Sequence, residues 1–113
     1  MKLTLPRSAL LDGLQTVQNV VGVRSTLPIL MNVLLTAEKN KLWLTTTDLD
    51  VTIRCGVDAQ ISKPGSSTLP VRRLFGIIRE LPEAEVELAI DEKNTALLTC
   101  QSSYFKIIRL GED

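Results

Sequence analysis

The chain has 113 residues, of which 44% are hydrophobic, which is enough to bury the core of one domain. Its 13 basic and 13 acidic side chains cancel, so the net charge by itself gives no sign of a polyanionic partner. No apolar run reaches the roughly 20 residues that a membrane-spanning helix needs, and no signal-peptide pattern follows Met1. We therefore expect a cytoplasmic protein with no membrane partner.

The first part of the chain predicts a strand and then a helix. The alternation from Lys2 to Leu5 favours a short strand, and Pro6 suits the first turn of a helix that stops near Gly22. A stripe of apolar residues marks the buried side of this helix: Leu10, Leu11, Leu14 and Val17. Polar residues mark the opposite side: Ser8, Asp12, Gln15 and Asn19.

A connector over residues 23–28 leads into three predicted strands. We place them at Met31 to Glu38, Lys41 to Thr46 and Leu49 to Val57, with turns at Lys39-Asn40 and Asp48. The third strand alternates, so one face of it should be buried and should hold Val51, Ile53, Cys55 and Val57. Antiparallel strands with one half-buried face are expected here.

The second part predicts the same order of elements. Residues 62–67 have the Ser, Gly and Pro composition of a linker, and a short strand then ends at Leu69. A helix follows from about Pro70 to Leu81 and is stopped by Pro82. Three further strands are expected at Val86 to Ile90, Thr95 to Gln101 and Tyr104 to Leu110, with turns at residues 91–94 and 102–103.

An internal repeat supports this division. Thr4-Leu5-Pro6 returns as Thr68-Leu69-Pro70, and the helical stripes after the two motifs match at the same offset. We predict a single domain over residues 1–113, with repeats of about 1–61 and 66–110. The expected fold is α+β, a duplicated β-α-β-β-β unit with pseudo-twofold symmetry, and its two helices lie on one face of antiparallel sheets.

Residues for catalysis or for metal binding are scarce. The chain has no histidine, no nucleophile elbow, no phosphate-binding glycine loop and no zinc-ligand spacing, so we expect neither an enzyme nor a cofactor. Asp48 and Asp50 could hold Mg²⁺, but Asp-Leu-Asp at the edge of a strand is more typical of a turn. Cys55 and Cys100 lie in apolar alternating segments, which favours buried thiols over a disulfide or redox role.

The distribution of charge is more informative than its sum. Residues 1–82 have a net charge of +4 and residues 83–113 a net charge of −4, so one face can be basic. Helical spacing places Arg72, Gly76 and Arg79 away from the apolar stripe, with Arg73 and Glu80 on the flank. The two outward arginines lie about 10 Å apart, a spacing that suits successive phosphates. A solvated helix face with no partner explains the same pattern.

The segment from Val21 to Val51 resembles a known family. It contains Thr-Leu-Pro-Ile-Leu at residues 26–30 and Thr-Asp-Leu at residues 47–49, and Leu81-Pro82-Glu83 also fits. This combination is similar to the first domain of the bacterial DNA polymerase III beta subunit, the sliding clamp, and the resemblance runs along the whole chain.

The resemblance implies a function as well as a fold. Members of this family form a ring of two head-to-tail subunits with three domains each, which encircles duplex DNA and tethers the polymerase to it. Their helices line the hole, and their contacts go to phosphates without reading the sequence. It implies a non-catalytic processivity factor whose partners are duplex DNA, the clamp loader, DNA polymerases and a second subunit.

The resemblance also assigns roles to single residues. Arg24 matches the DNA-contacting arginine of the connector, and Arg72 and Arg79 match basic positions of the inner helix.

A second group of residues falls where the first domain meets the third domain of the neighbouring subunit, namely Arg73, Tyr104 and Ile107. Family members often have a basic residue where Ser102 and Tyr104 stand, so a more apolar contact is expected here. Because the chain stops at Asp113, we expect a truncated first domain that lacks the peptide-binding groove between the second and third domains.

Two other functions remain open from the sequence. A protein-interaction or assembly domain of the same fold, without DNA contact, would depend on Tyr104 and Ile107 instead of the helix arginines. A small metal-dependent hydrolase would depend on Asp48 and Asp50.

Overall fold

A computed structural model of the chain describes residues 1–24, 32–47, 51–93 and 95–108, with the side chains of residues 19–24 excepted. In chain order the elements are β1 (Lys2–Pro6), α1 (Arg7–Arg24), β2 (Asn32–Glu38), β3 (Lys41–Thr47), β4 (Thr52–Asp58), β5 (Gln60–Lys63), β6 (Gly65–Pro70), α2 (Val71–Glu80), β7 (Glu85–Ile90), β8 (Ala96–Cys100) and β9 (Ser103–Ile107). The β-α-β-β-β order therefore occurs twice, as predicted, with β5 between the two series.

The strands form two antiparallel sheets that exchange one strand. The five-stranded sheet has the order β5-β1-β7-β8-β9, and the four-stranded sheet has the order β4-β3-β2-β6. The first strand of each series thus pairs with the other series, since Leu5 lies opposite Val86 and Leu69 lies opposite Val33. This exchange gives the fold its pseudo-twofold symmetry, and it means that each sheet contains three strands of one series and the first strand of the other.

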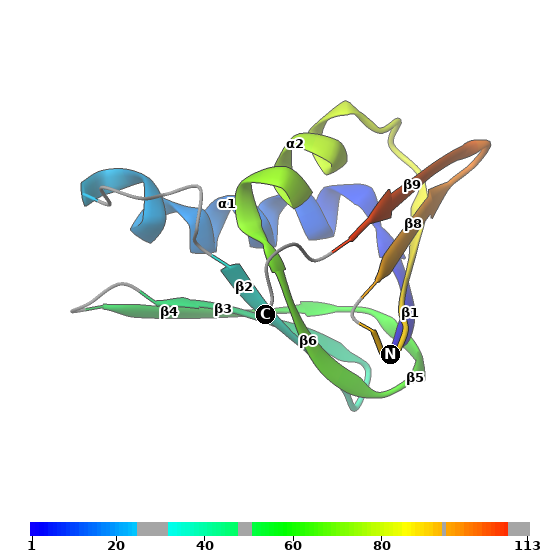
Figure 1. Cartoon of the computed structure of the whole chain (residues 1–113), viewed down its shortest axis with the longest axis horizontal. Helices are drawn as coiled ribbons and strands as arrows, with labels where there is room; N and C mark the ends of the chain where they lie inside the picture. The colour runs from blue at the N-terminus through cyan, green and yellow to red at the C-terminus, as the bar shows by residue number, and fades with distance from the viewer. Residues whose placement is uncertain (25–31, 48–50, 94, 109–113) are drawn as a thin grey trace.

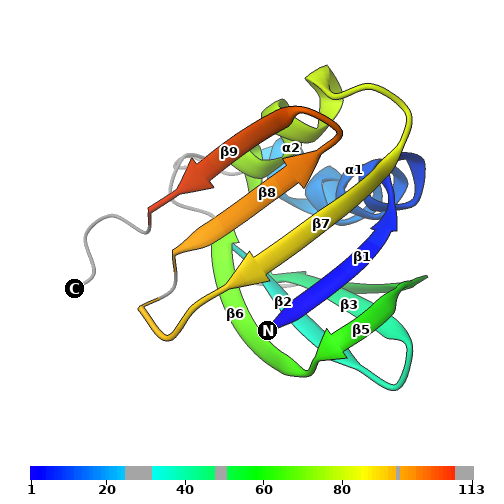
Figure 2. The same ribbon diagram turned by 90° about the vertical axis from the view of Figure 1, so that its right-hand side faces the viewer.

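The two helices lie side by side on one side of the molecule, as predicted (Figure 1). α1 packs on β3 and β4 and also contacts α2, while the five-stranded sheet closes the adjoining side (Figure 2). The predicted stripes are buried. Fully buried positions of the two helices are Leu10, Leu14, Val17, Leu74 and Ile78. Burial of these apolar faces between helices and sheets supplies most of the driving force for the fold.

The middle of α1 is tied to the sheet by a buried hydroxyl group. Thr46 is 1% exposed, and its Oγ1 donates to the main-chain carbonyl of Val17 over 2.7 Å. Because an unpaired polar group in a core is costly, this bond makes a threonine acceptable among leucines. It also fixes α1 relative to β3.

The predicted linker over residues 62–67 is wrong. Residues 60–63 form β5, and 65–70 form β6, with only Pro64 between them. Ile61 pairs with Leu3, and Ser66 pairs with Thr36. Ser and Gly composition indicates a loop only when no neighbouring strand offers main-chain partners, and here both sheets do. Gly65 makes the turn at φ 156°, which side-chain-bearing residues rarely adopt.

Several smaller predictions also need correction. α1 continues through Gly22 to Arg24, since a glycine inside a helix costs only about 1 kcal/mol. β4 starts at Thr52, so Val51 lies before it and is 50% exposed instead of buried. β9 ends at Ile107. Both cysteines are free thiols, as predicted, but only Cys100 is buried, and Cys55 is half-buried.

Candidate nucleic-acid interface

The outward side of α2 is basic and open. Arg72, Arg73 and Arg79 are exposed, and a Cβ atom placed on Gly76 would meet nothing within 4 Å. Among the described residues no ion pair involves Arg72. Nε of Arg79 lies 3.8 Å from Oε2 of Glu80, and its guanidinium lies 5.8 Å from the Phe75 ring centroid. An exposed pair of this length is weak, so the guanidinium remains available to a phosphate.

A residue that the sequence reading did not select fixes the position of α2. Nε of Arg7 donates to the carbonyl of Ile78 over 3.2 Å, and Nη2 donates to the carbonyl of Arg79 over 2.8 Å. These carbonyls belong to the last turn of α2, where the regular helical hydrogen bonds end and where positive charge is favourable. The carbonyl of Ile78 also accepts from the main-chain N–H of Leu81 over 3.2 Å. Arg7 therefore caps α2 from the first residue of α1.

Glu83 completes this connection from the other side. Oε1 of Glu83 lies 3.6 Å from Nη1 of Arg7, and its Oε2 accepts from the main-chain N–H of Ser8 over 3.4 Å. The main-chain N–H of Arg7 also donates to the carbonyl of Ala84 over 2.9 Å. The negative carboxylate of Glu83 lies at the positive start of α1, and the positive guanidinium of Arg7 lies at the negative end of α2, so both interact favourably with the helix dipoles. The two helices are thereby held in one fixed arrangement.

The described surface of α1 differs from that of α2. Its exposed positions Ser8, Asp12, Gln15 and Thr16 carry no positive charge. The predicted DNA-contacting residue Arg24 ends α1, and its side chain lies outside the described residues. Among the described residues, the exposed basic side chains on the helix side are therefore those of α2.

The predicted subunit-interface residues lie on α2 and β9, and they differ in exposure. Tyr104 is 62% exposed on β9, the edge strand of the five-stranded sheet, and Arg73 is exposed on α2. Ile107 is only 2% exposed, so the expectation that its side chain faces another subunit does not fit the packing of this chain. Strand alternation turns Ile107 into the core, and the neighbouring Ile108 is 53% exposed.

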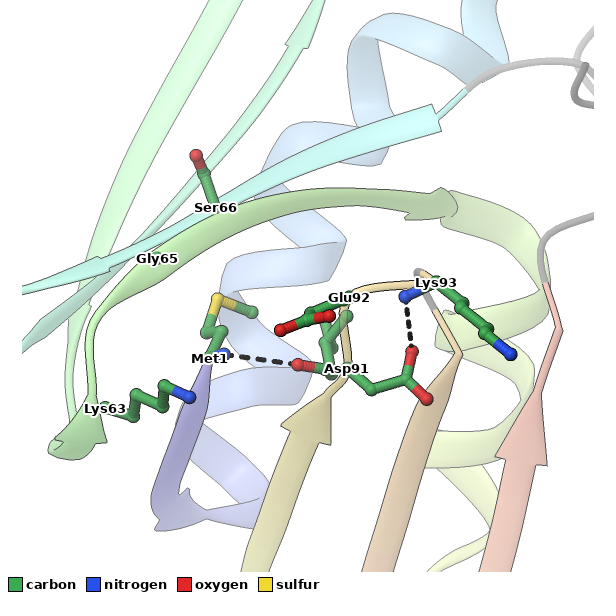
Figure 3. A pocket seen from close by; sticks show the side chains of 8 residues that line it. Met1, Lys63, Gly65, Ser66, Asp91, Glu92 and Lys93 are labelled. Atoms are coloured by element: carbon green, nitrogen blue, oxygen red, sulfur yellow. Dashed lines mark hydrogen bonds between the residues drawn. The ribbon is translucent and has the colours of Figure 1, made fainter.

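A hollow of about 660 Å³ lies between the β5–β6 connection and the β7–β8 turn (Figure 3). Lys63 and Lys93 line it together with Asp91 and Glu92, so the charges of both signs offset each other. The amino group of Met1 donates to the carbonyl of Ile90 over 3.2 Å, as the dashed line in Figure 3 shows.

The carboxylate of Asp91 is also engaged within the turn. It accepts from the main-chain N–H groups of Thr95 over 3.0 Å and of Lys93 over 2.8 Å, and these bonds, that of Thr95 first, lower its pKa below the ordinary value. Within the described residues no three His, Cys, Asp or Glu side chains gather as metal ligands. Asp48 and Asp50, the candidate magnesium ligands, lie outside those residues.

No helix among the described residues is long and apolar enough to cross a membrane.

Comparison with known proteins gives one consistent result. The family model of the DNA polymerase III beta subunit, N-terminal domain, matches residues 1–113. The beta sliding clamp of Chlamydia muridarum is 39% identical over 113 residues, which are 100% of this chain and 31% of that protein.

Solved structures agree in fold. The DNA polymerase sliding clamp of Caulobacter crescentus has a TM-score of 0.85 at 42% identity, over 96% of this chain and 30% of that one. The DNA polymerase III subunit beta of Pseudomonas aeruginosa has a TM-score of 0.85 at 36% identity, over 98% and 30%.

The chain thus spans about 30% of the length of the relatives it matches. The matches also confirm the predicted α+β clamp fold. With the fold, the basic helix and the match along its full length in agreement, the chain belongs to the DNA polymerase III beta subunit family, as its N-terminal domain.

Proposed function

We propose that this chain acts as the first domain of a DNA sliding clamp, a processivity factor that encircles duplex DNA and tethers the replicative polymerase. The observation that carries the proposal is the pair of exposed arginines, Arg72 and Arg79, on a helix surface that no other described element covers. Arg24 is the third proposed contact. Such contacts neutralise phosphates and carry no base readout, so the domain can slide along any sequence.

The proposed setting is a ring in the cytoplasm. The chain supplies one domain of three, with internal repeats of about 1–61 and 66–110, and the full-length protein forms a head-to-tail homodimer that engages the clamp loader and DNA polymerases. Two facts support a subunit contact at β9: this strand is the edge of its sheet, and Tyr104 is 62% exposed on it. Arg73 belongs to this contact, and Ile107 acts from beneath by holding β9 on the core.

Binding of duplex DNA by this chain tests the first part of the proposal. We expect weak binding that falls steeply with salt, because only a few phosphates are neutralised and no ring closes. Fluorescence anisotropy at low salt should show binding by the parent chain and its loss in the variant Arg24→Ala, Arg72→Ala, Arg79→Ala.

The matched control removes the same charge from the strands, as Lys2→Ala, Lys63→Ala, Lys106→Ala on β1, β5 and β9. This control should keep most of the affinity. Equal losses in the two triple variants would mean that net charge, and not the helix surface, determines binding, and that outcome would reject the three arginines as the site.

The second candidate function is a protein-interaction domain without DNA contact. It is favoured by two exposed side chains on and just after the edge strand β9, the aromatic Tyr104 and the aliphatic Ile108. Under this reading Tyr104→Lys abolishes capture of the partner subunit, and the triple arginine variant does not change it. Loss of DNA binding in the triple arginine variant would decide for the clamp, because a protein-interaction domain without DNA contact does not bind DNA through these arginines.

A further inference from the structure

We propose that the outer face of the four-stranded sheet binds a carboxylate of an acidic peptide segment from a partner protein, at Arg54 stacked on Trp43. The outer face is the side of the β4-β3-β2-β6 sheet turned away from α1. α1 covers the other side, since a Cβ atom on Gly13 would lie 3.2 Å from Leu44 and from Val57 (Figure 1). Residues that alternate with these two, Trp43 and Arg54 among them, face outward.

A glycine makes room for the tryptophan. Gly56 pairs with Trp43 across β3 and β4, and a Cβ atom on Gly56 would lie 2.6 Å from Cζ3 of Trp43. Real side chains do not approach that closely, so the indole ring occupies the space above the strand that a side chain would otherwise fill. The ring therefore lies flat on β4.

Arg54 is stacked on this ring. Its Cζ atom lies 4.1 Å from the ring centroid, within the range of a cation–π contact. A guanidinium held against an aromatic face has already lost much of its rotational freedom, and its N–H groups lie in the plane of the group, directed outward. This is the geometry that accepts a carboxylate through two parallel hydrogen bonds.

No described carboxylate neutralises Arg54. The ion pair that the same two strands do form joins Lys41 to Asp58, with Nζ and Oδ1 2.9 Å apart. The cross-strand neighbours of Arg54 are uncharged. Arg54 lies opposite Thr45 on β3, and Thr45 lies opposite Leu34 on β2. Within the described part of the sheet, the positive charge of Arg54 thus lies in a neutral patch and is complementary to a single negative group.

The distance between Arg54 and Leu34 indicates which peptide sequence the patch can bind. Leu34 is 39% exposed and lies two strands from Arg54, or about 10 Å at the usual distance between strands. An extended peptide advances about 3.3 Å per residue, so residues about three positions apart reach both. We therefore expect an acidic residue over Arg54 and an apolar residue over Leu34. A phosphate backbone fits less well, because it needs several cations and this patch offers one.

The inference does not rest on the proposed DNA function, because the outer face and the helix arginines lie on different sides of the four-stranded sheet. Trp43 is the only tryptophan of the chain, so its fluorescence reports on this face alone.

The test is a titration of the 113-residue chain with a short peptide blocked at both ends, in which glutamate and leucine stand about three positions apart among glycine and serine. The glutamate peptide should change Trp43 fluorescence saturably and shift the NMR signal of the Arg54 Nε–H. The analogue with glutamine in place of glutamate should bind about fivefold more weakly, the range of an exposed ion pair with good geometry.

Two variants make the outcome decisive. Arg54→Gln should abolish the difference between the two peptides, whereas Lys63→Gln, which removes an exposed charge from β5, should preserve it. Circular dichroism checks that both variants fold. Equal binding of the two peptides to the parent chain, no binding of the glutamate peptide, or a difference that persists in Arg54→Gln would each overturn the proposal. So would an Arg54 signal that responds to single-stranded oligothymidine and not to the peptide.

Discussion

Nη2 of Arg7 donates to the main-chain carbonyl of Arg79 over 2.8 Å, although the two residues are 72 positions apart in the chain. The first residue of α1 thereby holds the turn of α2 that carries a proposed phosphate-binding side chain. In the described part of the chain no equivalent contact runs from α2 to α1, because the position equivalent to Arg7 in the second series is Val71, an apolar residue that is fully buried. The pseudo-twofold symmetry is thus broken at the site that fixes the helices.

Replacement of Arg7 tests the strength of this cap. Arg7→Ala should lower the free energy of unfolding by about 1.5–3 kcal/mol, because charge-assisted bonds to the carbonyls of Ile78 and Arg79 at the end of α2 are lost. Arg7→Lys should restore only part of it, since one ammonium group does not reproduce the planar guanidinium fork. Urea denaturation measures both. Arg72→Ala serves as the exposed control and should stay within about 0.5 kcal/mol of the parent chain.

The salt dependence of DNA binding separates contact from positioning. Arg79→Ala should reduce the slope of log K against log salt by about 0.9, because one phosphate contact is lost. Arg7→Ala should weaken binding with no change in slope, since its guanidinium already binds the carbonyls of α2. A reduced slope in Arg7→Ala would show that this arginine contacts phosphate directly.

The repeat predicts equal roles for Leu10 and Leu74, which match in the two series and are both 0% exposed. Leu10→Ala and Leu74→Ala should each cost about 2–5 kcal/mol, with a single cooperative transition in both, because the exchanged strands join the halves into one core. Leu34→Ala, at a position 39% exposed, is the control and should cost less than either. A separate early transition in one of the two core variants would contradict a shared core.

Two glycines should respond to alanine with opposite signs. Gly76→Ala should raise the free energy of unfolding by about 0.5–1 kcal/mol, since alanine favours the helix and a Cβ atom meets nothing within 4 Å. Gly56→Ala should lower it, because the new Cβ would lie 2.6 Å from Trp43 and would displace the ring. A red shift of the tryptophan fluorescence should accompany the second change only. Similar stability of the two variants would argue against the flat placement of Trp43.

The Asp91 turn predicts a pH effect. Main-chain hydrogen bonds, that of Thr95 first, hold the folded-state pKa of Asp91 below 3.8. A carboxyl with a depressed folded-state pKa stabilises the fold above its unfolded pKa, and this stability is lost as the pH falls through the folded value. Asp91→Asn should therefore be less stable than the parent chain at neutral pH, and the gap should close below pH 3.8. An NMR titration that placed the Asp91 pKa above 3.8 would contradict the turn geometry.

Local periodicity in the sequence was enough to locate the elements and their buried faces. Three features follow from the spacing of apolar residues over a few positions, which can be read from a short segment alone. They are the stripe at Leu10 and Leu14, its repeat at Leu74 and Ile78, and the alternation in β4. The exposed position of Arg72 and Arg79 follows in the same way. Amino-acid composition wrongly predicted a linker at residues 62–67, because the strands that pair with Ile61 and Ser66 are distant in the sequence.

The sequence by itself determined the family, the order of strands and helices apart from β5, and the side of α2 that is basic. Only the tertiary structure decided that each sheet takes its first strand from the other series, that Arg7 caps α2, and that Trp43 lies on Gly56 beneath Arg54. The physical reason is the distance along the chain over which each interaction acts. Propensity and amphipathic spacing act within a few residues, whereas register, caps between helices and stacking across strands exist only after remote segments have been brought together.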